Sequence, residues 1–189
     1  DIAEKRMVDT LQRQVEETEA DIVIGNYFIY DENDGQCKFY VLERDFCIEE
    51  LSAQELIDRQ AGYWNLNASA FIMPMFKLFK KDLLLQVPFT NGRRFDDEAT
   101  IHRLFIKSQK TIFVNDNLYI YRVRQGSIMT SQFDLSWVQD ILQVFSLKLA
   151  DLILAGIDTS VMRIRFINIL NEYKYLCETY NLTETDEYR

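Results

Sequence analysis

The chain has 189 residues, of which 48% are hydrophobic and 27% are charged. This length and composition predict one well-packed globular domain, or one domain with a helical appendage, and argue against a disordered chain. The net charge of −9 argues against a nucleic-acid partner, because acidic residues outnumber the Lys and Arg that would neutralise phosphates.

Cysteine usage and apolar runs indicate the compartment. The three cysteines have irregular spacing and form no C-x-x-C pair, which fits a reducing compartment better than a disulfide framework or a zinc site. We expect Cys37, Cys47 and Cys177 to be small buried apolar residues. No apolar run approaches the ~20 residues that cross a bilayer, and no signal peptide is recognisable. A cytoplasmic location is therefore expected, with peripheral binding at the inner face of the membrane as an option.

The sequence pattern in the first part of the chain predicts a helix followed by two paired strands. Apolar residues recur every four positions between residues 3 and 19, which is typical of an amphipathic helix that packs on a sheet. A β-rich run over 21–30 leads through a turn signal at 31–35 to a second run at 37–42, and this pattern predicts a strand pair.

The middle of the chain mixes short helices with an aromatic loop. Ser52 and Glu55 fit a capping box, which predicts a short helix to about residue 60. Residues 63–67 are aromatic and polar without periodicity, as in a loop near a site. Further helical turns are predicted over 80–86, and a longer helix over 98–108.

The sequence pattern in the last third of the chain predicts strands and then a helical hairpin. Two β-like runs, 110–114 and 117–124, are separated by Asn115-Asp116 and are expected at the edges of the sheet. Two long apolar-periodic segments, 134–155 and 158–180, meet near Gly156 and predict two helices docked on the first part.

An acidic cluster lies at the start of the predicted 98–108 helix. Asp96, Asp97 and Glu98 follow one another there. Unpaired backbone N–H groups and the helix dipole stabilise acids in a first turn, so capping alone is the favoured explanation on spacing.

Three segments around this cluster resemble a known family when they are taken together. They are FIMPMFKLFKKDLL (residues 71–84), FDDE (95–98) and LYIYRVRQGSIM (118–129). Their succession resembles the C-terminal half of a family 2 glycosyltransferase of the GT-A type, in which a K-L-[YF]-K segment, an acidic E-D motif and a Y-x-Y-R-x-R-x-G-S-I segment occur in this order. The resemblance implies an α/β fold: a partial GT-A sheet with flanking helices over residues 1–130, followed by the helical appendage over 131–189.

The resemblance also implies a reaction. An inverting enzyme of this family transfers a sugar from a nucleotide-sugar to a hydroxyl acceptor, in polysaccharide or glycoprotein assembly, and needs one carboxylate as general base. The second acid of the family motif supplies it, so Asp97 takes the base position and Asp96 replaces the usual glutamate. This departure leaves open which of the two is the closer analogue. Glu98 is placed on the acceptor side, with a purely structural role as its alternative.

The arginine-rich segment is implied to bind the diphosphate of the donor. Arginine forks match phosphate oxygens, which assigns Arg122, Arg124 and Ser127 to this role, and Gly126 lets the backbone approach a ligand. The equally weighted alternative is an edge strand whose arginines point to one solvated face.

Three further side chains are singled out. Lys77 is a lone cation in an apolar run and needs a partner, either a phosphate of the nucleotide or an acid such as Asp97. Trp64 is a candidate to stack on an acceptor sugar, with an ordinary core contact as its alternative. His102 is interpreted as structural.

The family's divalent metal, Mn or Mg, is expected mainly on a D-x-D motif, and this chain contains none. The family places that motif just upstream of a helix like the predicted 3–19 helix, so we expect the chain alone to be inactive and to contribute no metal ligand. The implied partners are a nucleotide-sugar donor and a glycan, lipid-linked or protein acceptor, with homo-oligomerisation through the C-terminal helices as an option. The alternative function is a non-catalytic interaction or oligomerisation module on a degenerate glycosyltransferase fold.

Overall fold

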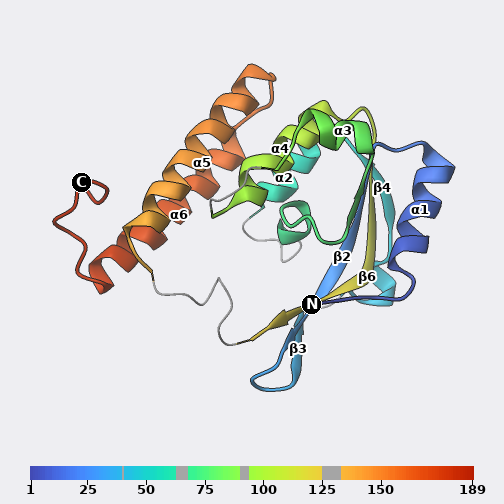
Figure 1. Ribbon diagram of the computed structural model, residues 1–189, viewed down its shortest axis with the longest axis horizontal. Coiled ribbons are helices and arrows are strands. Elements are labelled where there is room, and N and C mark those ends of the chain that lie inside the picture. Colours follow the sequence, from blue (N-terminus) through green and yellow to red (C-terminus); the bar gives the residue numbers. More distant parts are fainter. Residues whose placement is uncertain (40, 63–67, 90–93, 125–132) are drawn as a thin grey trace.

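The computed structural model describes residues 1–39, 41–62, 68–89, 94–124 and 133–189, with only the backbone of residues 38 and 39. Within these ranges the fold is mixed α/β, as expected (Figure 1). The elements are β1 (Ile2–Ala3), α1 (Met7–Thr18), β2 (Ile22–Asp31), β3 (Gln36–Phe39), the 3₁₀ turn η1 (Glu43–Asp45), β4 (Ile48–Leu51), α2 (Ala53–Ala61), the 3₁₀ turn η2 (Ala68–Phe71), β5 (Lys77–Phe79), α3 (Lys81–Gln86), α4 (Asp96–Lys107), β6 (Thr111–Val123), α5 (Leu135–Leu154) and α6 (Ser160–Thr179).

Two long parallel strands, β2 and β6, form the centre of the described sheet. Each of them has a further neighbour at either end, and all four of these neighbours run antiparallel to it. The start of β2 pairs with β5 and its end with β3, while the start of β6 pairs with β4 and its end with β1. The predicted pairing of the first two strand runs is confirmed as β2 with β3.

The prediction of two separate strand runs at the sheet edges around Asn115-Asp116 is wrong. One continuous central strand, β6, covers both runs. Ile24 pairs with Phe113 and Asn26 with Asn117, so an irregularity in β6 accommodates the polar pair without ending the strand. Asn26 Nδ2 donates to Asn115 Oδ1 over 2.8 Å in the buried interior. Buried side-chain amides need hydrogen-bond partners, and this contact joins two of them across the central strands.

Alternate residues of the central strands supply two apolar layers, one on each face. On one face, Val23 and Leu118 pack with Leu11 of α1, which confirms that this helix covers a sheet. On the other face, Ile24 and Phe113 pack with residues of α2 and α4. Figure 1 shows α1 on one side of the sheet and α2 and α4 on the other.

The helix starts depend on the strands and caps beside them. α1 begins at Met7 rather than near residue 3, because Ile2 and Ala3 pair with β6. The capping box predicted for α2 is confirmed: the Glu55 N–H donates to Ser52 Oγ over 3.3 Å, and the Ser52 N–H donates to Glu55 Oε2 over 2.8 Å.

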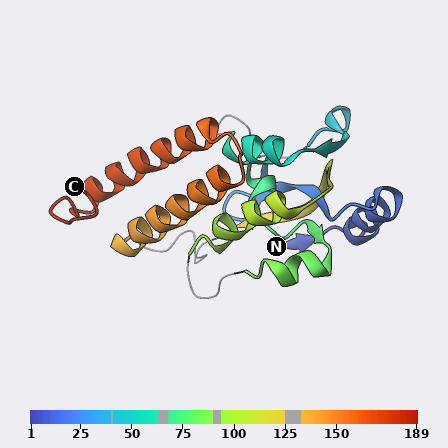
Figure 2. The same cartoon turned by 90° about the horizontal axis from the view of Figure 1, so that it is seen from above.

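The predicted hairpin is confirmed as α5 and α6, which lie side by side and extend away from the sheet (Figures 1 and 2). Gly156, in the turn between them, has a φ of 73°, a conformation that glycine adopts without strain. The side-chain amide of Gln54 on α2 anchors this turn, because it accepts from the Asp158 N–H (2.8 Å) and donates to the Asp158 carbonyl (3.1 Å). Phe145 of α5 and Met162 of α6 belong to the same buried cluster as α2 and α4, so the hairpin shares the core of the first part.

The cysteines follow the expectation only in part. Cys177 is buried, Cys47 is half-buried and Cys37 is exposed, so the prediction of three buried cysteines is wrong for Cys37. It lies on β3, which pairs with β2. Within the described ranges, no helix has both the length and the apolar character to span a bilayer.

Candidate active site

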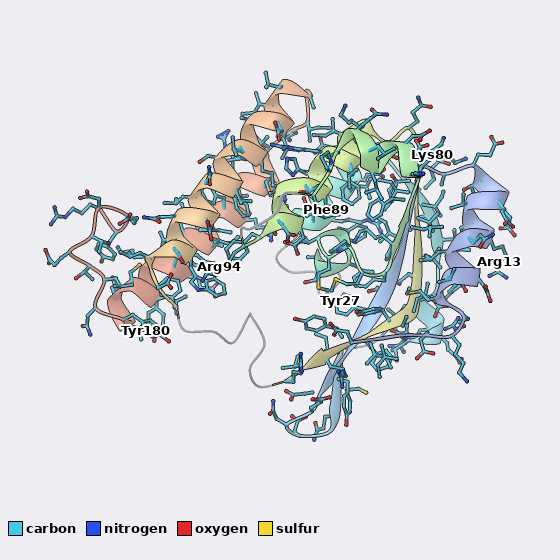
Figure 3. The ribbon with its side chains drawn as sticks, viewed as in Figure 1. Arg13, Tyr27, Lys80, Phe89, Arg94 and Tyr180 are labelled. Atoms are coloured by element: carbon cyan, nitrogen blue, oxygen red, sulfur yellow. The ribbon has the colours of Figure 1, made fainter. Side chains whose placement is uncertain are left out.

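A cleft of about 1290 Å³ lies between the ends of the central strands, the first turn of α4 and the helical hairpin. Figure 3 labels Tyr27, on the sheet side of this cleft, and Arg94, beside the hairpin. The described residues that line it include five of those predicted from the sequence: Asp96, Asp97, Glu98, Arg122 and Arg124. The fold therefore brings the acidic cluster and both arginines to one surface.

The first turn of α4 presents the acids in a fixed direction. The Asp97 N–H donates to Asp96 Oδ1 (2.9 Å) and the Glu98 N–H donates to Asp97 Oδ1 (2.8 Å), so these acids bind backbone N–H groups within the first turn. The N-cap residue itself is Phe95, which makes no side-chain cap bond, so the predicted capping is not seen in its usual form. Asp96 is exposed and Asp97 is half-buried. Burial raises the pKa of Asp97, and the charges of Glu98 and Asp96 raise it further. The Asp97 carboxylate thus combines a contact to a first-turn N–H group with a raised pKa.

The residue before this turn has an unusual backbone. Phe95 has a φ of 60°. This value lies in the left-handed region, which residues other than glycine rarely adopt. Its ring meets Trp137 of α5 edge-on, with 5.6 Å between the ring centroids. The neighbouring Arg94 stacks over the same indole at 4.9 Å and donates to Ser136 Oγ at 2.5 Å. Contacts with the hairpin therefore fix Arg94 and Phe95, the residues that lead into α4. These contacts keep Phe95 in its strained backbone conformation.

Glu98 points away from solvent. Both of its carboxylate oxygens have cationic partners, Lys148 Nζ at 2.7 Å and Arg165 Nη2. Burial alone would raise the pKa of Glu98, but the two cations lower it to about 2. These contacts favour the structural role that was the alternative for Glu98. Acceptor binding by Glu98 stays a prediction.

Lys77 of β5 is buried beneath the cleft wall. Its Nζ donates to the carbonyl of Ala70 at 2.6 Å and to that of Met73, so its partners are backbone oxygens of the segment that lines the cleft. Burial lowers the pKa of Lys77 to about 7, opposed by the nearby charge of Asp97. The two partners considered from the sequence, a phosphate and an acid, did not include these carbonyls.

The two arginines lie at the end of β6. Arg122 Nη1 donates to Glu32 Oε1 of the β2–β3 turn at 2.7 Å, and its backbone N–H donates to Asp1 Oδ1 at 3.1 Å. Arg124 follows the strand and is exposed. Both side chains line the cleft. The edge-strand alternative assumed a strand at the margin of the sheet, whereas Arg122 lies opposite Tyr30 in the central pair.

Three donors at the cleft have no hydrogen-bond partner within the described part of the chain: Arg122 Nε, Trp137 Nε1 and Arg165 Nη1. A buried donor without a partner costs about 1–3 kcal/mol, and functional sites are a usual place for such a cost. Trp137 and Arg165 belong to the hairpin. Sequence reasoning missed both, because the apolar periodicity of a helix does not show which of its polar residues reach a cleft.

The remaining predicted residues divide into two groups. Trp64 and Ser127 lie outside the described residues, as does Gly126. His102 is structural: it is buried, its Nδ1 lies 3.1 Å from the Glu98 carbonyl, and its Nε2 lies 3.1 Å from Asp151 Oδ2.

The metal expected from the family has no preformed site in the described part of the chain. No group of three or more His, Cys, Asp or Glu there has a metal-binding arrangement. The metal therefore stays an expectation, and no step of the proposed chemistry is assigned to it.

The chain is similar over its full length to glycosyltransferase GlyG of Streptococcus pneumoniae serotype 4, with 57% identity over 189 residues. A stretch of 128 residues, 68% of the chain, is 29% identical to part of glycosyltransferase GlyA from the same organism. Both relatives are named glycosyltransferases. The chain spans 63% of the length of GlyG, and its matched stretch spans 18% of GlyA. No protein family model matches the chain.

Proposed function

We propose that this chain is the acceptor-side part of an inverting glycosyltransferase of family 2 with a GT-A fold, acting in bacterial polysaccharide or glycoprotein assembly. One observation carries the proposal: the acidic cluster and the arginine segment, which are separate in sequence, line the same cleft. The similarity to two glycosyltransferases over all or most of the chain supports the same chemistry.

In the proposed reaction, an acceptor hydroxyl attacks the anomeric carbon of the donor sugar. The new carbon–oxygen bond forms as the bond from that carbon to the diphosphate breaks, and the nucleoside diphosphate leaves. Asp97 receives the hydroxyl proton. Burial and neighbouring acids raise its pKa, and a carboxylate with a raised pKa is a better proton acceptor while it is ionised.

Arg122 and Arg124 are proposed to bind the diphosphate. A guanidinium binds phosphate oxygens with paired hydrogen bonds, and both arginines line the cleft, Arg122 near the end of β6 and Arg124 just after it. Arg122 has one Nε–H without a partner within the described residues, and a ligand oxygen would satisfy it.

The activity is tested with the full-length protein. It is incubated with a panel of nucleotide-sugars, with and without simple glycosides as acceptors, and the released nucleoside diphosphate is measured. Asp97→Asn should abolish transfer while the affinity for UDP, GDP or ADP, whichever binds by calorimetry, stays nearly unchanged. Glu17→Gln, on the exposed side of α1, is the control. Transfer by Asp97→Asn at the normal rate would remove Asp97 from the base position.

The diphosphate role is tested separately. Arg124→Ala should weaken nucleoside-diphosphate binding in the same calorimetry, and unchanged affinity would remove Arg124 from the site. Arg163→Ala, which replaces an exposed arginine on α6, is the matched control.

A non-catalytic module that associates through the hairpin is the second candidate function. Several large apolar side chains of α5 and α6 are exposed: Leu147, Ile153, Leu154, Ile164, Ile167 and Tyr175. Exposed apolar surface of this kind is common at protein interfaces. Sedimentation velocity tests this candidate: Ile164→Lys with Ile167→Lys should convert a dimer to a monomer, and a wild-type monomer at all concentrations would reject it.

A further inference from the structure

We propose that Lys148 and Arg165 of the hairpin are positioning residues for Asp97, acting through the buried carboxylate of Glu98. The inference rests on the proposed function, because it takes Asp97 as the general base. It gives the hairpin a role in the reaction beyond that of an appendage.

The geometry joins three helices at one carboxylate. Glu98 Oε2 accepts from Lys148 Nζ of α5 at 2.7 Å, and Glu98 Oε1 accepts from Arg165 Nη2 of α6. Lys148 is 0% exposed and Glu98 is 5% exposed, so water screens the contact between these two residues little. One cation from each hairpin helix therefore holds the first turn of α4.

Asp97 is directly coupled to this turn. It precedes Glu98, and its Oδ1 accepts from the Glu98 backbone N–H at 2.8 Å. A rotation or slide of α4 would carry Asp97 with it. Further along α4, Arg103 Nε donates to Asp151 Oδ2 of α5 at 2.6 Å, which fixes the same two helices a second time.

Stability alone is a weak explanation for this arrangement. A buried ion pair often contributes no more than well-packed apolar residues of similar volume, because both charges lose their hydration. Here the group contains three charges and lies beside the proposed base. Placement to within a fraction of an ångström is what a general base needs, because a misplacement of 1 Å costs about 100-fold in rate.

The charges that act on Asp97 come from several elements. Glu98 and Asp96 lie on its own helix and raise its pKa, while Lys148 on α5 lowers it. Lys77 on β5 is close enough that the charge of Asp97 raises the pKa of Lys77. Arg165 on α6 lines the same cleft as Asp97. Glu98→Gln removes one of the charges that raise this pKa while keeping the shape of the side chain.

The test compares variants of the full-length protein with the donor and acceptor identified by the activity screen. Lys148→Met and Arg165→Met should each lower kcat about tenfold or more, with little change in the affinity for the nucleoside diphosphate. Gln54→Ala is the control, because the Gln54 side chain bonds to the hairpin turn and to Asp58 of its own helix. It should leave kcat within about twofold of wild type. Thermal unfolding identifies the variants that remain folded at the assay temperature.

Two further variants provide readouts that a merely structural role would not give. Glu98→Gln should move the acid limb of the pH profile of kcat/KM to lower pH, because the pKa of Asp97 falls. Arg165→Lys keeps the charge but loses the Nη2 group that donates to Glu98 Oε1, so it should fold and still lower kcat.

The outcomes separate the two proposals. If Asp97→Asn keeps full activity, the proposed function itself fails. If Asp97→Asn is inactive while Arg165→Lys and the folded Met variants keep the wild-type kcat, or while Glu98→Gln leaves the acid limb in place, the positioning role is overturned.

Discussion

Glu98 of α4 and Lys148 of α5 form a buried ion pair with 2.7 Å between Oε2 and Nζ, although they are 50 residues apart in the chain. Removing one member of such a pair leaves a buried charge without compensation, which typically destabilises a protein by about 3–5 kcal/mol.

Glu98→Leu should therefore lower the free energy of unfolding by about this amount, because Lys148 and Arg165 both lose their counter-charge. Urea unfolding followed by circular dichroism measures the change. Glu184→Leu is the control: its partner Arg189 lies 3.4 Å away at the exposed surface, and such pairs contribute little. Equal stability of the two variants would contradict the prediction.

Stability should also fall in acid because of Glu98. Its pKa is about 2 in the folded protein and about 4.5 in an unfolded chain, so the unfolded chain binds the proton first. The stabilisation is complete above about pH 4.5 and is lost as the pH falls towards 2. Denaturant unfolding between pH 6 and 2 should show a smaller loss for Glu98→Gln than for wild type. Parallel curves for the two proteins would assign the acid sensitivity to other groups.

Lys77 should make stability rise with pH as well, but in the neutral to alkaline range. Its pKa is about 7 in the folded protein and about 10.5 in the unfolded chain, so between these values the unfolded chain binds a proton that the folded protein has released. The free energy of unfolding therefore rises with pH across this range. In melting curves at pH 7, 8, 9 and 10, Lys77→Met should lack this gain, and Lys80→Met, which replaces an exposed lysine, should keep it. A gain of the same size in Lys77→Met would show that the gain has another source.

Gly25→Ala should destabilise the sheet by about 1–3 kcal/mol through overpacking. A Cβ at this position of β2 would lie 2.9 Å from Leu118 Cδ1 and 3.3 Å from the Phe76 carbonyl oxygen. Leu118→Ala removes the closer contact, so in a double-mutant cycle the two changes together should cost less than their sum. Strict additivity would mean that Leu118 is not the residue that excludes a side chain here.

Much of the fold follows from local patterns in the sequence. The capping box at Ser52 and the glycine between two periodic segments each act over a few residues, and both predictions are confirmed. The Asn115-Asp116 pair misled the prediction because two polar residues usually signal a turn. In the structure, Asn115 donates to the Asp45 carbonyl and accepts from Asn26, partners that lie 70 and 89 residues away.

The candidate site was predictable where residues follow a motif and unpredictable where they depend on tertiary contacts. Asp97 and Arg124 were identified from their segments, and both line the cleft. The two carbonyls that accept from Lys77, and the two cations that hold Glu98, are fixed only once the chain has folded. Trp137 gave no signal, because a tryptophan on an apolar helix face is most simply interpreted as core.

The parallel pairing of β2 with β6 also has a consequence for how the protein folds. Asn26 and Asn115, which bond across this pair, are 89 residues apart, and the sheet centre cannot form until that long loop has closed. Contacts between distant residues slow folding, because the entropy of loop closure is lost before the contacts repay it. α5 and α6, by contrast, are joined by a short turn. We therefore expect the helical hairpin to form before the centre of the sheet, and the contacts of the hairpin with Glu98 to form in a later step than the hairpin itself.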